Sequence, residues 1–144
     1  MKKIILSSVI TLGILATSIG SISALADGID AYGNSSDTSF DYNFAPGLGS
    51  TRYTASRVKY DATSAYMKLQ SRTKKQNYTA SVVDSNNKNF SQTWFVEVKT
   101  IGTEYFIPNN AYEDQGYGVK VRIKAHTGDL FGFGASGVWS PDSV

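Results

Sequence analysis

The stretch VKVRIKAH, residues 119–126, alternates apolar and basic side chains along its whole length. Successive side chains of a β-strand point to opposite faces of the sheet. One face therefore carries Val119, Val121, Ile123 and Ala125, and the other carries Lys120, Arg122, Lys124 and His126. The pattern predicts a half-buried strand whose basic row faces either water or an anionic partner.

Similar strand signals recur along the chain, separated by turn-forming segments such as DATS, RTKKQN, DSNNKN and HTGD. Besides Tyr117–His126, the predicted strands are Phe40–Phe44, Thr51–Tyr60, Ser64–Ser71, Tyr78–Val83, Ser91–Thr100, Glu104–Ile107 and Leu130–Trp139. No segment shows a convincing helical period. The fold class predicted for residues 51–144 is therefore all-β, a single antiparallel β-sandwich or small barrel of about seven or eight strands.

The first residues have the layout of a secretory signal peptide. Lys2 and Lys3 precede an uncharged run over residues 4–26, which closes on Ala24-Leu25-Ala26. We expect residues 1–26 to be cleaved after Ala26 and the product to be secreted. The alternative is an uncleaved anchor, because the run is long enough to cross a bilayer core of about 30 Å. Residues 27–50 then form a polar, acidic N-terminal arm.

Composition excludes several classes of site. The chain of 144 residues has no cysteine and one histidine, His126. Disulfides, thiol catalysis, cysteine-ligated zinc and multi-histidine metal sites are therefore excluded. The net charge of +2 depends on Lys2 and Lys3, so the product of cleavage has as many acidic as basic residues. A global basic field for nucleic acid is not supported.

Charge is nevertheless segregated along the sequence. The acids Asp27, Asp30, Asp37 and Asp41 come before any base of the cleaved product. Residues 51–80 then carry the bases Arg52, Arg57, Lys59, Lys68, Arg72, Lys74 and Lys75 with the single acid Asp61. Either the acidic arm neutralises this basic segment, or the bases form a binding surface.

No motif predicts a catalytic residue or a cofactor. GFGASG places Gly132, Gly134 and Gly137 as in a dinucleotide fingerprint, but the following helix and acid that the mechanism needs are missing. These glycines are better read as a bulge or a close strand contact. A pair of His126 with Asp129 lacks the elbow that presents a serine nucleophile.

The carboxylates suggest neither a glycosidase pair nor a strong metal site. Glu97, Glu104, Glu113 and Asp114 are the candidates for a hydrolase, and nothing in their spacing selects two of them. The loop DSNNKN has Lys88 where a calcium loop has a ligand, so it is read as a hairpin turn. A weak calcium site in the Asp27–Asp41 arm remains open.

The basic row is the candidate binding site, with Lys120, Arg122, Lys124 and the neighbouring Tyr117 as the expected contacts. If it aligns with Arg52, Arg57, Lys59 or Lys68, the resulting patch would suit an anionic cell-wall polymer, a membrane surface or an acidic glycan. The alternative is a solvated face that discourages edge pairing. Two other functions stay open: carbohydrate binding through exposed Tyr and Trp, and wall hydrolysis.

The start MKK, the sequence ALA before Asp27, the cysteine-free strand domain and the ending GVWSPDS resemble small exported proteins of Gram-positive bacteria. More narrowly, the chain resembles an uncharacterised domain-of-unknown-function family of such proteins. In general style it is similar to the lactococcin-like β-sandwich bacteriocins. The resemblance implies an exported effector with a membrane partner, and it assigns no catalytic residue.

Overall fold

The computed structural model describes residues 33–144, and Asn34–Val144 form one compact unit. Its strands are β3 (Thr38–Phe44), β4 (Ser50–Tyr53), β5 (Arg57–Lys59), β6 (Ala65–Arg72), β7 (Tyr78–Asp84), β8 (Val96–Val98), β9 (Glu104–Ile107), β10 (Val119–Thr127) and β11 (Phe133–Ser140), and its one named helix is α2 (Ala111–Gln115). The predicted signal peptide, Asp27 and Asp30 lie outside the described residues. No helix within residues 33–144 is long and apolar enough to cross a membrane.

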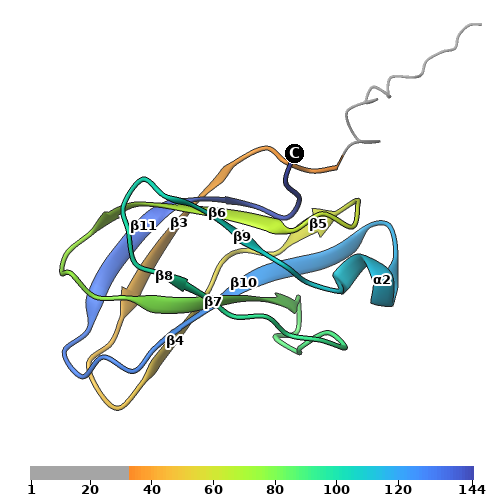
Figure 1. Ribbon diagram of the computed structural model, residues 1–144. Helices are drawn as coiled ribbons and strands as arrows, with labels where there is room; N and C mark the ends of the chain where they lie inside the picture. The colour runs from red at the N-terminus through yellow and green to blue at the C-terminus, as the bar shows by residue number, and fades with distance from the viewer. Residues whose placement is uncertain (1–32) are drawn as a thin grey trace, which may run out of the picture. The chain divides into compact units, whose positions relative to one another are not determined.

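The strands form two antiparallel sheets packed face to face, which is the sandwich alternative of the predicted fold (Figure 1). The first sheet has the order β4-β10-β7-β8, with β5 also paired to β10. The second sheet has the order β3-β11-β6-β9. VKVRIKAH thus becomes the central strand β10, paired with β4 and β5 on one side and with β7 on the other.

The described residues contain nine strands, because the strand predicted at Thr51–Tyr60 is interrupted. Between β4 and β5 the chain leaves the ladder at Thr54, whose Oγ1 accepts a hydrogen bond from the Ile123 N–H at 2.9 Å. The strand predicted at Ser91–Thr100 is also shorter and covers only Val96–Val98. Helix α2 was not predicted, since five residues are too few to show a period.

Strand β3 forms a large part of the core. Phe40, Tyr42 and Phe44 are at most 5% exposed, and β3 pairs with β11 from Phe44↔Phe133 to Thr38↔Trp139. Tyr42 and Phe44 pack their rings against Tyr78 of the other sheet at centroid distances of 5.7 and 5.4 Å. The strand predicted at Phe40–Phe44 is thus present as β3, and residues 34–50 of the expected arm belong to the sandwich.

A buried ion pair closes the sandwich at the end of β5 and just after the end of β11. The side chains of Lys59 and Asp142 are fully buried, with Nζ and Oδ1 2.8 Å apart. Lys59 also donates to the carbonyls of Thr63 and Pro141. The other oxygen of Asp142 accepts the N–H groups of Asn34 at 2.6 Å and Tyr60 at 2.9 Å. In a chain without disulfides, this network ties together three segments that are distant in sequence, at residues 34, 59–63 and 141–142.

Two glycines of GFGASG stand where the sequence predicted a bulge or a close contact. The β6–β11 pairing shifts register between Ser136 and Gly137, and Gly137 lies against the backbone of β6. Gly132 has a φ of 69°, and a Cβ there would come within 2.5 Å of the Phe44 carbonyl oxygen. Backbone packing explains these glycines without a nucleotide.

Candidate functional site

The basic row lies on the outer face of the first sheet, as the alternation predicts. Along β10, Val119, Val121, Ile123 and Ala125 are buried in the core, while Lys120 and His126 are exposed and Arg122 and Lys124 are half-buried. Neighbouring strands place Val58 beside Lys120 and Tyr53 beside Lys124. We call the outward side chains Lys120, Arg122, Lys124 and His126 the β10 row.

The four members of the β10 row differ in how much of their bonding capacity the protein already uses. Lys120 and Lys124 make no side-chain hydrogen bond or ion pair with any residue in the range 33–144. Arg122, in contrast, donates from Nε to the Thr54 carbonyl at 3.0 Å and from an Nη to Asn87 Oδ1 at 3.1 Å. Its guanidinium also lies 5.6 Å from the ring centre of Tyr53.

His126 at the far end of the row has a local partner, since its Nδ1 lies 2.9 Å from Thr51 Oγ1. Asp129 instead accepts the N–H of Phe131 at 3.1 Å. The two residues considered for a catalytic pair are therefore engaged separately. Within the β10 row, His126 therefore makes a structural contact. The charges of Lys120 and Lys124 are available to bind a ligand.

Tyr117 lies just before β10, with 64% of its surface exposed. Its ring stacks on that of Tyr60, with centroids 4.8 Å apart and an interplanar angle of 25°. Tyr60 directly follows Lys59, which pairs with Val119, so the two rings lie at the Lys120 end of the row. Tyr117 thus lies beside the row, and Tyr60 is an addition that the sequence did not single out.

The wider patch expected from neighbouring bases does not form. Arg52 turns to the sheet edge and donates to the Asn43 carbonyl at 2.7 Å. Arg57 reaches the Ser36 carbonyl at 2.7 Å and lies over Trp139 at 5.7 Å. Lys59 is buried, and Lys68 lies on β6 of the other sheet. The alignment on which the wider patch depended therefore does not occur, because each of these bases belongs to an edge, to the interior or to the opposite sheet.

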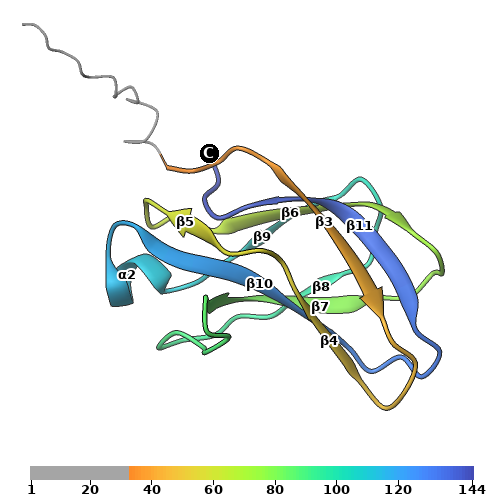
Figure 2. The same ribbon diagram turned by 180° about the vertical axis from the view of Figure 1, so that it is seen from behind.

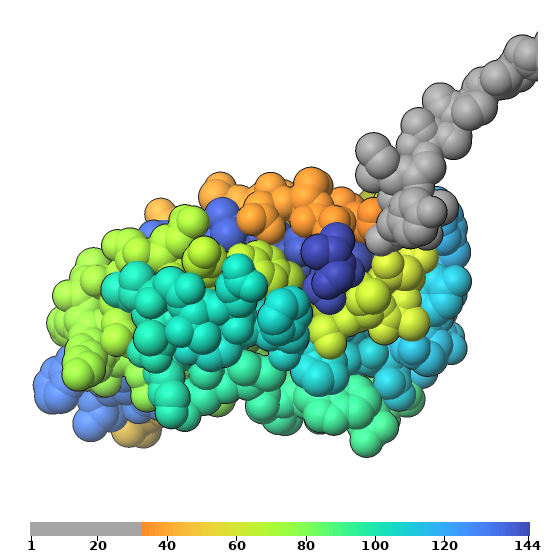
Figure 3. Space-filling view, turned by 45° about the horizontal axis from the view of Figure 1, so that its top comes forward, coloured from red at the N-terminus to blue at the C-terminus, as the bar shows by residue number. Residues whose placement is uncertain are grey.

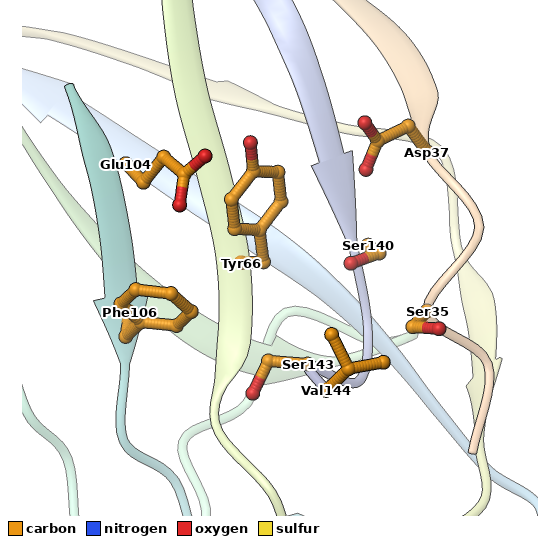
Figure 4. Close-up of a pocket in the computed structure, with 8 residues that line it drawn as sticks. All are labelled: Ser35, Asp37, Tyr66, Glu104, Phe106, Ser140, Ser143 and Val144. Carbon is orange, nitrogen blue, oxygen red and sulfur yellow. The ribbon is translucent and has the colours of Figure 1, made fainter. Parts of the chain in front are cut away.

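The outer face of the second sheet carries a groove of about 310 Å³ with a different chemistry. Tyr66 stands between Asp37 and Glu104, with Phe106 beside it on β9 (Figure 4). Desolvation and then the charges of Glu104 and Asp37 raise the pKa of the Tyr66 hydroxyl. This acidic groove would repel an anion, so an anionic ligand fits the first sheet and not the second.

The carboxylates considered for catalysis are not brought together. Glu97 lies on β8 and Glu104 on β9, in different sheets. Asp114, on helix α2, accepts both the N–H and the hydroxyl of Ser91. Within residues 33–144, no group of three or more metal-binding side chains forms a possible metal site.

The loop at residues 84–89 is the hairpin turn that the sequence predicted. One oxygen of Asp84 accepts the N–H groups of Asn86 and Lys88, at 2.8 and 2.9 Å. Asn87 has a φ of 68° and offers its side-chain oxygen to Arg122. The carboxylate thus shapes a turn that helps to hold the β10 row.

Fold and surface together define a small two-sheet β-sandwich protein with a basic row on one outer face and an acidic groove on the other. Over residues 22–143 the chain matches the family described as "Protein of unknown function (DUF2712)", and it belongs to that family. The expected membership of an uncharacterised family is thereby confirmed. Comparison with curated proteins and with solved structures finds no match.

Proposed function

We propose that this protein is secreted and non-catalytic, and that it binds an anionic polymer of the cell envelope through the β10 row. The observation that carries the proposal is the pair of lysines, Lys120 and Lys124, which have no partner within residues 33–144 on an otherwise well-bonded face. Strand geometry places them about 13 Å apart, which suits successive charges of an extended polymer.

The position of β10 favours binding over edge protection. Charged side chains often prevent aggregation at an unpaired sheet edge, but β10 has paired neighbours on both sides. The bases are therefore not needed to block strand addition. Arg122 is held by Thr54, Asn87 and Tyr53, so one cation is fixed in place between two lysines that are available to a ligand.

In the proposed mechanism, Lys120 and Lys124 attract phosphate or carboxylate groups, and the stacked Tyr60 and Tyr117 rings pack against the less polar parts of the polymer. Such contacts weaken as salt screens the charges. The finer form of the proposal, a bacteriocin-like action on other cells, is tested by adding the purified protein to bacterial cultures and measuring growth.

Replacing both lysines, in Lys120→Gln/Lys124→Gln, is expected to weaken binding to purified cell walls at low salt about tenfold or more, because two charge-assisted contacts are lost. Sedimentation with the walls measures the binding. The matched control is Lys68→Gln/Lys99→Gln, which removes the same charge from β6 and from the residue after β8 and should bind like the wild type. Equal loss in the two variants, or no loss in either, would contradict the proposal.

A neutral glycan is the second candidate ligand, favoured by the exposed ring of Tyr117 stacked on Tyr60. Neutral glycan binding would be insensitive to salt and to the lysine substitutions. It would be lost in Tyr117→Ala. The salt dependence of the wild type therefore separates the two ligands in one titration.

A further inference from the structure

We propose that one end of the sandwich docks on the surface of a lipid bilayer that contains anionic headgroups. The surface consists of three loops, at residues 45–49, 73–77 and 128–132, which connect β3 to β4, β6 to β7 and β10 to β11. We call it the loop end. Figures 1 and 2 show, from opposite sides, the β3–β4 and β10–β11 loops next to each other at this end. The β10 row does not form part of it, so the inference goes beyond the proposed function.

The loop end exposes three large apolar side chains that the fold does not need for its core. Leu48 is 93% exposed, Phe131 72% and Leu130 52%. In Figure 3 the blue atoms around residues 128–132 project at the lower left of the molecule, with tan atoms of the β3–β4 loop below them. Apolar side chains that cluster on projecting loops mark a contact with another apolar phase.

These side chains are held outward by a well-bonded backbone. The N–H of Gly47 donates to the Leu130 carbonyl at 3.0 Å and joins the two loops directly. Ala45 N–H donates to Ser50 Oγ at 3.0 Å, and Phe131 N–H donates to Asp129. The apolar tips are therefore presented in a fixed arrangement, and little ordering is needed when they bind.

The charge beside the apolar tips identifies the kind of surface. Lys74 and Lys75, in the β6–β7 loop, are both exposed. The Nζ of Lys74 lies 3.3 Å from the Phe131 carbonyl oxygen, so this cation is next to the apolar tip. The nearby acid Asp129 is engaged by the Phe131 N–H. Apolar side chains that enter the headgroup region, flanked by lysines that meet anionic lipid, are the combination used by interfacial membrane-binding segments.

A bilayer fits this surface better than a polymer chain does. Leu48 and Leu130 stand exposed on their loops, and Phe131 borders an open groove of about 500 Å³ whose lining also includes Asp41 and Lys74. A single extended polymer in that groove could therefore cover only part of the three side chains. A lipid surface can accommodate all three tips at once and adapts to their different heights. Its headgroups also provide anions beside Lys74 and Lys75 without any special register.

The test uses residues 27–144, which retain the whole compact unit, because the apolar run before residue 27 would bind lipid by itself. Sedimentation with phosphatidylcholine vesicles, with and without phosphatidylglycerol, measures binding. We expect the wild type to bind the vesicles that contain phosphatidylglycerol. Leu48→Ser/Phe131→Ser should weaken this binding about tenfold or more. The control Phe95→Ser/Phe106→Ser removes two other exposed rings and should bind like the wild type.

The charge contribution is tested by Lys74→Gln/Lys75→Gln, which should lose about tenfold on anionic vesicles and little on neutral ones. The inference is wrong if the wild type does not bind anionic vesicles at low salt, or if Leu48→Ser/Phe131→Ser binds them as well as the wild type. A wild-type dimer that this variant abolishes would identify the loop end as a contact between copies and would also overturn it.

The same vesicles separate this inference from the proposed function. Lys120→Gln/Lys124→Gln should lose binding to cell walls and keep binding to vesicles. Leu48→Ser/Phe131→Ser should do the opposite. If the lysine variant loses vesicle binding while the loop variant retains it, the β10 row is the lipid contact and the loop end is not.

Discussion

Replacing Asp142 with asparagine is expected to lower the free energy of unfolding by about 3–5 kcal/mol, because it leaves Lys59 charged, buried and without its counterion. The amide is a poor substitute. One carboxylate oxygen faces the Lys59 ammonium and the other faces the N–H groups of Asn34 and Tyr60. In either orientation the amide nitrogen meets a donor. Urea unfolding measures the loss.

The matched control is Asp41→Asn, which removes the same charge from an exposed position on β3 and should change stability by less than about 0.5 kcal/mol. The double variant Lys59→Met/Asp142→Leu removes both charges. It should be more stable than Asp142→Asn, since neither charge remains buried alone. If Asp142→Asn unfolds within about 1 kcal/mol of the wild type, the ion pair does not hold the sandwich together.

The ion pair also makes the free energy of unfolding depend on pH. Burial alone would raise the pKa of Asp142, but hydrogen bonds from Lys59, Tyr60 and Asn34 and the charge of Lys59 outweigh it. The pKa therefore lies below the ordinary value of 3.8. A carboxyl group with a lowered folded-state pKa stabilises the protein above its unfolded pKa and loses that contribution as the pH falls through the folded value. The difference between wild type and Asp142→Asn should shrink below about pH 4.

Replacing Gly137 with alanine is expected to cost about 3 kcal/mol or more, the second large effect. An added Cβ would collide with the Lys68 carbonyl oxygen and lie 3.0 Å from the Phe40 ring and 3.1 Å from the Gln70 nitrogen. Two of these three neighbours are backbone atoms of β6 at the register shift, so they cannot rotate away. Relief therefore requires β11 to move away from β6.

Gly128→Ala is the control for Gly137→Ala, because nothing lies within 4 Å of a Cβ at Gly128. This control should be as stable as the wild type or slightly more stable, since alanine restricts the unfolded chain. Thermal unfolding of the two variants makes the comparison. Equal melting temperatures for the two variants would show that β11 and β6 accommodate the added methyl group at Gly137, which would contradict the structure.

Periodicity predicted the parts of the fold that depend on side-chain alternation. Strand β9 has the predicted bounds Glu104–Ile107, and β7 differs from its prediction by one residue. The same reasoning predicted Phe40–Phe44, where three aromatic residues alternate with polar ones, and β3 extends this strand by two residues to Thr38. The polar, glycine-rich residues around this strand suggested an arm outside the core, although three aromatic side chains on one face suffice to bury the strand.

The site could be predicted only in part, because alternation gives two faces and does not say which one is buried. In β10 the apolar face is obvious. In β5, Arg57 and Lys59 share one face and Val58 the other, and this suggests that the lysine points outward. The structure buries Lys59 because Asp142, 83 residues further along the chain, supplies the counterion. No local pattern contains that information. The loop end was missed for a related reason, since the loops that carry Leu48 and Phe131 lie side by side only because each of them connects one sheet to the other at the same end.

The pairing of β3 with β11 has a consequence for the order of folding. The second sheet cannot close until Phe133–Ser140 reaches Thr38–Phe44, and Asp142 must then find Lys59 from the other end of the sequence. Closing such long loops costs chain entropy before the native contacts form and stabilise the fold. Proteins of this topology therefore fold in about milliseconds to seconds. The polypeptide therefore stays open until its last strand is available, and its aromatic residues are exposed to chaperones or to proteases during that interval.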